Sequence, residues 1–198
     1  MKLLATDEAR FDSNDHGPLT QAIPHTAAGR KRILPRKFTN FPLSVHVWAA
    51  IGKQFKRLVI FPEKQTGDND GNGFFRVNAK AYVARCLPKI VTHCLTHKLT
   101  ILQDGAKAHT ARSTKCYLAR KRVRYFTNWP ARSPDLNPIE HLWAWMKKEV
   151  GKRPPPSSRD ELVLYIREAW DAMPLSTVES HLKNWESAMT RCMESSGR

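Results

Sequence analysis

The chain has 198 residues, of which 41% are hydrophobic, enough for one large domain with a core or one domain with an appendage. Its 33 Lys and Arg outnumber 18 Asp and Glu, and this charge of +15 favours an acidic partner such as nucleic acid over a merely solvated basic surface. The chain lacks both an apolar run near the ~20 residues that span a bilayer and the apolar core of a signal peptide, so we expect no membrane partner and a soluble, intracellular protein.

The first elements in chain order are strands. Residues 2–6 predict a short strand that ends in the acidic pair Asp7–Glu8. The stretch 11–40 shows no periodicity, which indicates a long loop or an irregular hairpin. Two apolar runs, 45–51 and 57–61, are separated by a Gly-Lys turn and predict an antiparallel pair of strands.

A helix and a strand are expected next. Apolar residues recur at helical spacing over 78–95, and Pro88 is expected to kink that helix. Cys86 and Cys94 fall on its apolar face, and none of the four cysteines forms a C-x-x-C pair, so we expect a reducing compartment and no zinc site. A strand at 99–103 follows.

The remaining chain is mostly helical. A basic helix is predicted at 110–121, a short strand at 123–126, and helices at 138–150, at 158–173 and from Leu175 onward. Strands that alternate with helices predict an α/β fold with a mixed sheet and helical crossovers. We expect residues 1–152 to form the core and residues 153–198 a helical C-terminal extension packed on it.

Three carboxylates stand on elements that could converge. Asp104 closes the strand 99–103, Asp7 follows the first strand, and Glu140 begins a helix. If the first and fourth strands are neighbours, Asp7 and Asp104 lie side by side. Oxygen ligands suit Mg²⁺, and two such ions roughly 3.5–4 Å apart can activate a water or a 3′-hydroxyl at a phosphodiester.

Each of these acids also has an alternative interpretation. Asp7 and Glu8 could form a solvated turn, and Glu140 could belong to a capping box that begins at Asn137. Asp104 is harder to explain without a ligand, because it is the only acid between residues 70 and 135 and its neighbours in sequence are cations.

Clusters of cations supply the predicted DNA contacts. No acid interrupts the cluster after Asp104, which favours phosphate contacts over a solvated face. His109 could orient a water or contact a phosphate, although a histidine at a helix start with no catalytic role is the alternative. The predicted DNA-binding residues are Arg30, Lys31, Arg32, Lys107, His109, Arg112, Lys115, Arg120, Lys121, Arg122 and Arg132.

Two blocks of sequence resemble the catalytic domain of mariner-type DNA transposases of the DDE superfamily. They are Gln-Asp-Gly-Ala-Lys-Ala-His-Thr-Ala at 103–111 and Trp-Pro-Ala-Arg-Ser-Pro-Asp-Leu-Asn-Pro-Ile-Glu-His-Leu-Trp at 129–143. The start, Ala-Thr-Asp-Glu-Ala-Arg-Phe at 5–11, is similar to that family's first catalytic strand. The similarity covers nearly the whole chain in order, and the second block is highly specific.

The resemblance implies a ribonuclease H-like mixed five-stranded sheet flanked by helices, with an Asp-Asp-Glu triad that binds two Mg²⁺ or Mn²⁺ ions. Matched by motif, the catalytic and metal-binding residues are Asp7, Asp104 and Glu140, and the 35 residues between the last two fit the family's gap. The implied activity is cleavage of both strands at transposon ends with water, followed by joining of the freed 3′-hydroxyl to target DNA. A homodimer is among the implied assemblies.

Two departures from the family pattern qualify the expectation. Gly105 stands where the family usually has Asn, which should loosen the turn beside the metal site. The chain also begins at the first catalytic strand, so we expect weak or absent recognition of transposon ends. The alternatives are a catalytically idle, truncated or domesticated DNA-binding remnant and a ribonuclease H-like nuclease for other nucleic acids. We expect a nuclear location in a eukaryote and otherwise the cytoplasm or nucleoid.

Overall fold

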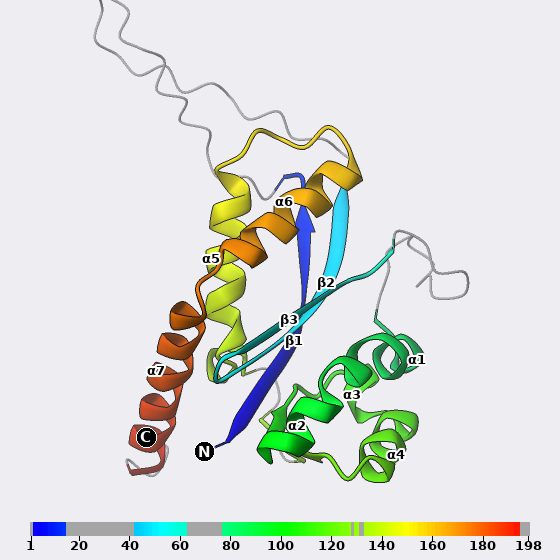
Figure 1. The fold of residues 1–198 in the computed structure, drawn as a ribbon, viewed down its shortest axis with the longest axis vertical. Coiled ribbons are helices and arrows are strands. Elements are labelled where there is room, and N and C mark those ends of the chain that lie inside the picture. Colours follow the sequence, from blue (N-terminus) through cyan, green and yellow to red (C-terminus); the bar gives the residue numbers. More distant parts are fainter. Residues whose placement is uncertain (1, 15–41, 63–76, 128, 131–132, 195–198) are drawn as a thin grey trace, which may run out of the picture.

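A five-stranded mixed sheet forms the centre of the molecule. The computed structural model describes residues 2–14, 42–62, 77–127, 129–130 and 133–194 (Figure 1). The strands run in the spatial order β3-β2-β1-β4-β5, with β1 antiparallel to β2 and parallel to β4. Their bounds are β1 Leu3–Asp12, β2 Ser44–Gly52, β3 Phe55–Ile60, β4 Thr100–Leu102 and β5 Arg124–Tyr125. The predicted mixed sheet and the predicted antiparallel pair are confirmed.

Strand β1 is longer than predicted. The acidic pair Asp7–Glu8 does not end it, because β1 continues to Asp12 and pairs with β2 along that whole length. Apolar residues keep alternating beyond the pair, and Phe11 is buried. A half-buried strand tolerates acids at single positions when the apolar alternation around them persists. The solvated-turn alternative for Asp7 and Glu8 is therefore wrong.

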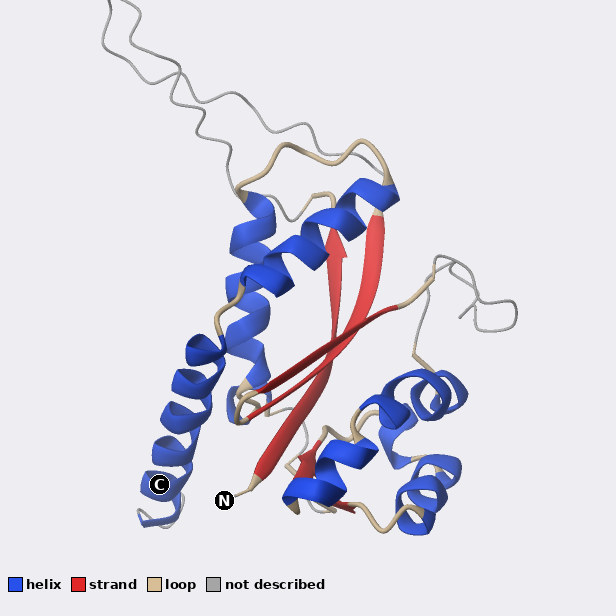
Figure 2. Cartoon of the chain, viewed as in Figure 1, coloured by secondary structure: helices blue, strands red, loops and turns tan. Residues whose placement is uncertain are grey.

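The helices cover both faces of the sheet (Figure 2). Their bounds are α1 Ala79–Ala81, η1 Tyr82–Cys86, η2 Leu87–Lys89, α2 Val91–His97, α3 Lys107–Thr110, α4 Arg112–Arg120, η3 Pro134–Leu136, α5 Ile139–Gly151, α6 Arg159–Ala172 and α7 Leu175–Glu194. The predicted helix 78–95 is interrupted by a π-turn and a 3₁₀ turn around Pro88, where the ring cannot donate a hydrogen bond. The basic helix begins at Lys107, earlier than predicted, and breaks at Ala111.

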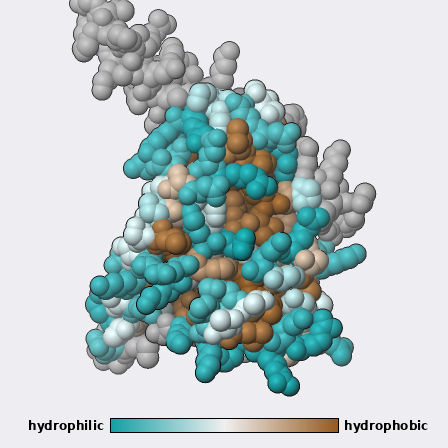
Figure 3. All heavy atoms as spheres, viewed as in Figure 1, coloured by the Kyte–Doolittle hydropathy of each residue, from teal (hydrophilic) through white to brown (hydrophobic). Residues whose placement is uncertain are grey.

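Two hydrophobic clusters occupy the two sides of the sheet, and β1 contributes alternately to them. Leu4 packs with α1, α2 and α4, whereas Ala5 packs with α5, α6 and α7. Cys86 and Cys94 are buried in the first cluster, as predicted. In the space-filling view, apolar atoms reach the surface over the strands between α6 and the α1–α4 group (Figure 3). The edge strand β3 is only partly buried there.

The last two helices share a core with the sheet. Side chains of α6 and α7, including Ile166, Trp170 and Val178, pack in the same cluster as β2 and α5. The division into a core at 1–152 and an extension at 153–198 stays a prediction. Among the described residues, no helix combines the length and the apolar character that crossing a membrane requires.

A lysine on β3 joins α6 to the sheet. Lys56 Nζ donates to the carbonyls of Met173 at 2.7 Å and Asp171 at 3.3 Å, and also to that of Trp170. These carbonyls lie at the C-terminal end of α6, where backbone acceptors lack helical partners.

We expect Lys56→Met to lower the free energy of unfolding by about 1–2 kcal/mol, because it leaves these carbonyls without their donor. Urea unfolding followed by tryptophan fluorescence measures the change. Lys53→Met is the matched control, because Lys53 is exposed in the turn after β2. Equal unfolding free energies for the two variants would show that the Lys56 contacts contribute nothing.

Candidate active site

Strand register places two of the three predicted acids at the same height. β1 and β4 are parallel, with Leu3 opposite Thr100 and Ala5 opposite Leu102. Continuing this register by two residues beyond β4 sets Asp7 level with Asp104. Carboxyl ends of neighbouring parallel strands are where α/β folds place their ligand sites. The predicted neighbourhood of the first and fourth strands is therefore confirmed.

Asp7 faces α5 and has lost most of its contact with solvent. Trp143 Nε1 on α5 donates to Asp7 Oδ2 at 3.1 Å. The pKa of Asp7 is raised from 3.8 to about 8, chiefly by burial and in addition by the charges of Glu8 and Glu140. Glu140 is thus close enough to Asp7 for the two carboxylates to repel each other.

A hydrogen bond from the start of α5 to β1 fixes the position of Glu140. Asn137, immediately before α5, donates from Nδ2 to the carbonyl of Thr6 at 3.2 Å and accepts from Ile139 N at 3.4 Å. Within the described residues the Glu140 carboxylate accepts no hydrogen bond, so it does not close the predicted capping box. The capping alternative is not supported, and Glu140 stands one residue into α5, beside Asp7.

Asp104 is held by the turn that follows β4. Its Oδ1 accepts from Ala106 N at 2.9 Å and contacts His109 Nδ1 at 2.6 Å. The hydrogen bond from His109 lowers the pKa of Asp104, so this acid stays ionised. The expectation that Gly105 loosens the turn is not supported, because the Asp104 side chain itself closes it. A Cβ at Gly105 would meet no atom within 4 Å, so Asn would also fit.

His109 is buried and bridges two acids. Its side chain is fully buried, and Nε2 contacts Glu8 Oε1 at 3.1 Å while Nδ1 contacts Asp104. Burial lowers the pKa of His109, but hydrogen bonds to Asp104 and Glu8 outweigh it and raise the pKa to about 10. The prediction that His109 contacts DNA is wrong, because no surface of the ring is left for a phosphate.

Sequence reasoning missed the role of Glu8. Because side chains alternate along a strand, Asp7 points to α5 and Glu8 points to the opposite side of the sheet. The alternation along β1 puts Glu8 on the same face as Leu4, and this pattern is visible in the sequence. The prediction that the strand ends at the acidic pair left no face to assign to Glu8.

The donor set suits a hard divalent cation in type, although the carboxylates do not form one cluster. Asp7, Asp104 and Glu140 offer only oxygen, which Mg²⁺ and Mn²⁺ prefer. Within the described part of the chain, no three acid, histidine or cysteine side chains lie close enough together to hold a metal ion. Asp7 lies near Glu140, and the strand register places Asp104 level with Asp7. The Asp104 carboxylate, however, points toward His109.

The family match falls on the segment that carries Asp104 and Glu140. Residues 75–163 match the family described as DDE superfamily endonuclease. This segment resembles the DDE superfamily. The chain is 27% identical over 158 residues to the Tc3 transposase of Caenorhabditis elegans, covering 78% of this chain and 44% of that protein. It is 35% identical over 91 residues to the Tcb2 transposase of Caenorhabditis briggsae, covering 46% of this chain and 31% of that protein.

The chain is thus similar to the Tc1/mariner transposases, as the resemblance implied. The chain spans less than half the length of the curated relatives that it matches.

Solved structures support the predicted fold. The crystal structure of the Mos1 mariner transposase catalytic domain superimposes with a TM-score of 0.67 and 16% identity, covering 100% of this chain and 83% of that one. The Mos1 paired-end complex with the left transposon end superimposes with a TM-score of 0.69 and 17% identity, covering 100% of this chain and 56% of that one. The predicted ribonuclease H-like fold is confirmed.

The predicted DNA-binding cations of the DDE segment lie on its surface. Those in the described residues, His109 apart, are exposed on α3, on α4 and just after it: Lys107, Arg112, Lys115, Arg120, Lys121 and Arg122. The predicted contacts Arg30, Lys31, Arg32 and Arg132 lie outside the described residues. Helices α3 and α4 therefore carry exposed cations on their outer side and the buried His109 on their inner side, and DNA binding by these cations stays a prediction.

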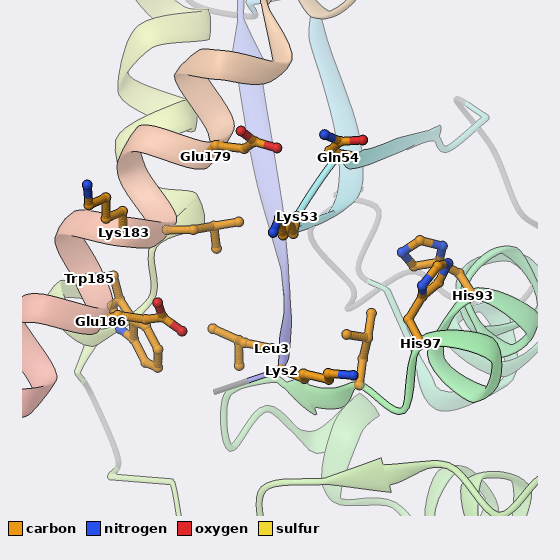
Figure 4. Close-up of a pocket in the computed structure, with 12 residues that line it drawn as sticks. Lys2, Leu3, Lys53, Gln54, His93, His97, Glu179, Lys183, Trp185 and Glu186 are labelled. Atoms are coloured by element: carbon orange, nitrogen blue, oxygen red, sulfur yellow. The ribbon is translucent and has the colours of Figure 1, made fainter.

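A cavity of about 950 Å³ lies away from Asp7, Asp104 and Glu140 (Figure 4). Lys2, Leu3 and Leu99 line it at the amino ends of β1 and β4, together with His97 of α2 and Glu186 of α7. Asp104 instead follows the carboxyl end of β4, Asp7 lies level with it in the middle of β1, and Glu140 lies on α5. This cavity is therefore not the candidate active site.

Proposed function

We propose that the chain is the catalytic domain of a cut-and-paste transposase, which cleaves DNA strands and transfers them to target DNA with the help of divalent metal ions. The observation that carries the proposal is the placement of Asp7 on β1 level with Asp104, which follows the adjacent parallel strand β4, with Glu140 beside Asp7. Relationship to the Tc1/mariner transposases supports the choice of DNA as substrate.

The residues divide into ligands and supports. Asp7, Asp104 and Glu140 would hold two Mg²⁺ or Mn²⁺ ions, whose chemistry is activation of a water or 3′-hydroxyl and stabilisation of the leaving oxygen. Trp143 orients Asp7 through its indole N–H, and Asn137 fixes the start of α5, and with it Glu140, against β1. Mutual repulsion of Asp7 and Glu140 favours a bound cation between them.

The exposed cations of α3 and α4 would bind the DNA backbone. Phosphate contacts of this kind position a duplex without reading its sequence. The Mos1 relatives of this fold were crystallised as DNA complexes, including a pre-cleavage transpososome and a strand transfer complex. A homodimer and a nuclear location in a eukaryotic host remain part of the proposal.

Removal of the metal tests the proposal directly. We expect the chain to cleave transposon-end DNA in Mg²⁺ or Mn²⁺, leaving a 3′-hydroxyl, and to show no cleavage when EDTA is present. Denaturing gels of end-labelled DNA measure the products. Cleavage that persists in EDTA contradicts the proposal. Preferential cleavage of the RNA strand of an RNA–DNA hybrid would instead identify a ribonuclease H-like nuclease.

A DNA-binding remnant is the second candidate. It is favoured by the separation of Asp104 from the Asp7–Glu140 pair, because no three metal-ligating side chains of the described residues come together. This candidate predicts salt-sensitive binding that ignores sequence, with no cleavage in either metal. The same gels, together with binding measured in Mg²⁺, distinguish the two candidates.

A further inference from the structure

A buried histidine links the strand that carries Asp7 to the turn that carries Asp104. Glu8 Oε1 on β1 lies 3.1 Å from His109 Nε2, and His109 Nδ1 lies 2.6 Å from Asp104 Oδ1. The His109 side chain is completely buried, while Glu8 is 23% and Asp104 is 53% exposed. The three side chains form a continuous path from the interior to the surface at the carboxyl end of β4.

These contacts hold one carboxylate oxygen of Asp104 and leave the other oxygen without a hydrogen bond in the described residues. Oδ1 contacts both His109 Nδ1 and Ala106 N. Within the described residues, Oδ2 accepts no hydrogen bond. A half-exposed carboxylate on a turn would otherwise sample several rotamers, and a ligand held in one rotamer binds a metal more tightly.

His109 is itself held from two sides. Its ring lies against the Tyr82 ring, with centroids 4.5 Å apart, and its far nitrogen is anchored by Glu8. Tyr82 also donates to Gln103 Oε1 at 2.8 Å, next to Asp104 in the chain. The histidine therefore has little freedom to turn away from Asp104.

We propose that His109 and Glu8 are positioning residues that hold the Asp104 carboxylate with Oδ1 turned inward and Oδ2 directed to a divalent cation. The inference rests on the proposed function and deepens it. Glu8 acts only through His109, because its carboxylate points to the side of the sheet opposite Asp7 and α5. The second acid of the Asp7–Glu8 pair thus supports the site without being a ligand.

The test compares Mn²⁺ affinity, measured by electron paramagnetic resonance on the DNA-free protein, with the Mn²⁺ concentration that gives half-maximal cleavage. The variants are His109→Phe, which keeps the ring against Tyr82, Glu8→Gln, and the double variant. Thr114→Val is the matched control, because Thr114 is fully buried in the same segment and donates to the Ala108 carbonyl at 2.6 Å, away from the acids.

We expect His109→Phe to weaken Mn²⁺ binding by about 10- to 100-fold, the usual effect of losing a partner behind a metal ligand. Glu8→Gln should weaken it less, and the double variant should bind no more weakly than His109→Phe, because both changes break one path. Thr114→Val should lower the melting temperature and leave Mn²⁺ affinity unchanged. Half-maximal cleavage should shift in parallel with affinity.

Two results overturn the inference while leaving the proposed function intact. One is a wild type that binds Mn²⁺ and cleaves DNA while His109→Phe matches Thr114→Val in affinity. The other is a double variant in which the two losses multiply, which would make Glu8 an independent ligand. If His109→Phe does not fold, Glu8→Gln alone must bind Mn²⁺ more weakly than Thr114→Val, or the inference fails. A wild type that neither binds Mn²⁺ nor cleaves ends the proposed function and this inference with it.

Discussion

Asp7→Asn is expected to abolish metal-dependent cleavage and, at the same time, to stabilise the metal-free protein. Loss of one carboxylate from a site that works as a unit should lower the cleavage rate by about four orders of magnitude. The stabilisation follows from the surroundings of Asp7, which is mostly buried and faces the charges of Glu8 and Glu140. Asn keeps an oxygen for the indole N–H of Trp143 and removes the charge.

The stability difference should depend on pH in a defined direction. The pKa of Asp7 rises from 3.8 to about 8 on folding, and burial of the carboxyl group is the largest cause. A raised acid pKa contributes stability that is fully present below the unfolded value and is lost as pH rises through the folded value. The wild type should therefore lose stability relative to Asp7→Asn between about pH 4 and pH 8.

Thermal unfolding in EDTA measures this difference. One unit of pKa shift corresponds to about 1.4 kcal/mol, and each kcal/mol moves the melting temperature of a chain of this size by about 2–4 °C. At pH 8 the melting temperature of Asp7→Asn should exceed that of the wild type by more than the shift that one unit of pKa would cause. Asp135→Asn is the control, because Asp135 is exposed and its loss should leave the pH profile unchanged. Parallel pH profiles for wild type and Asp7→Asn would refute the electrostatic account.

Removing three cations from α4 and the turn after it should weaken DNA binding at every sequence. The triple variant Lys115→Gln, Lys121→Gln, Arg122→Gln keeps exposed polar side chains and removes three positive charges. If each charge neutralises one phosphate, the slope of log affinity against log salt should become shallower by about 2.7, since each contact contributes about 0.9. Fluorescence anisotropy of a labelled duplex at several salt concentrations measures the slope.

A matched triple variant on the other side of the sheet separates local contacts from net charge. Lys152, Arg167 and Lys183 are also exposed, on or beside α5, α6 and α7. Replacing them by Gln lowers the net charge by the same amount, and the salt slope should change little. Equal changes in slope for the two variants would mean that DNA is attracted by total charge, without a defined face.

Sequence patterns predicted the elements well where apolar periodicity is long. The strand at 45–51 and the helices at 138–150 and 158–173 agree with β2, α5 and α6 to within a few residues. Asp104 could be singled out because it is isolated among cations, and Asp7 and Glu140 because they stand after a predicted strand and at a predicted helix start. Motif matching then assigned all three acids to one triad. The shared height of Asp7 and Asp104 followed from the predicted neighbourhood of their strands.

Long-range side-chain contacts could not be predicted in the same way. The partner of Asp104 is His109, five residues away, but the partner of His109 is Glu8, 101 residues away, and only the folded sheet joins them. Trp143 is buried, and its hydrogen bond to Asp7 depends on how α5 crosses β1. Such contacts depend on rotamers and helix placement, which local patterns do not encode.

The alternation of Asp7 and Glu8 along β1 makes the two acids impossible to exchange. Deleting a single codon between Leu4 and Asp7 would shift every later residue of the strand by one place, carry the second acid to the α5 side and leave His109 facing alanine. Such a deletion preserves an acid at the position of the first ligand and still removes the anchor behind Asp104. Inactive gene copies that retain all three motif acids can therefore arise from changes in spacing alone.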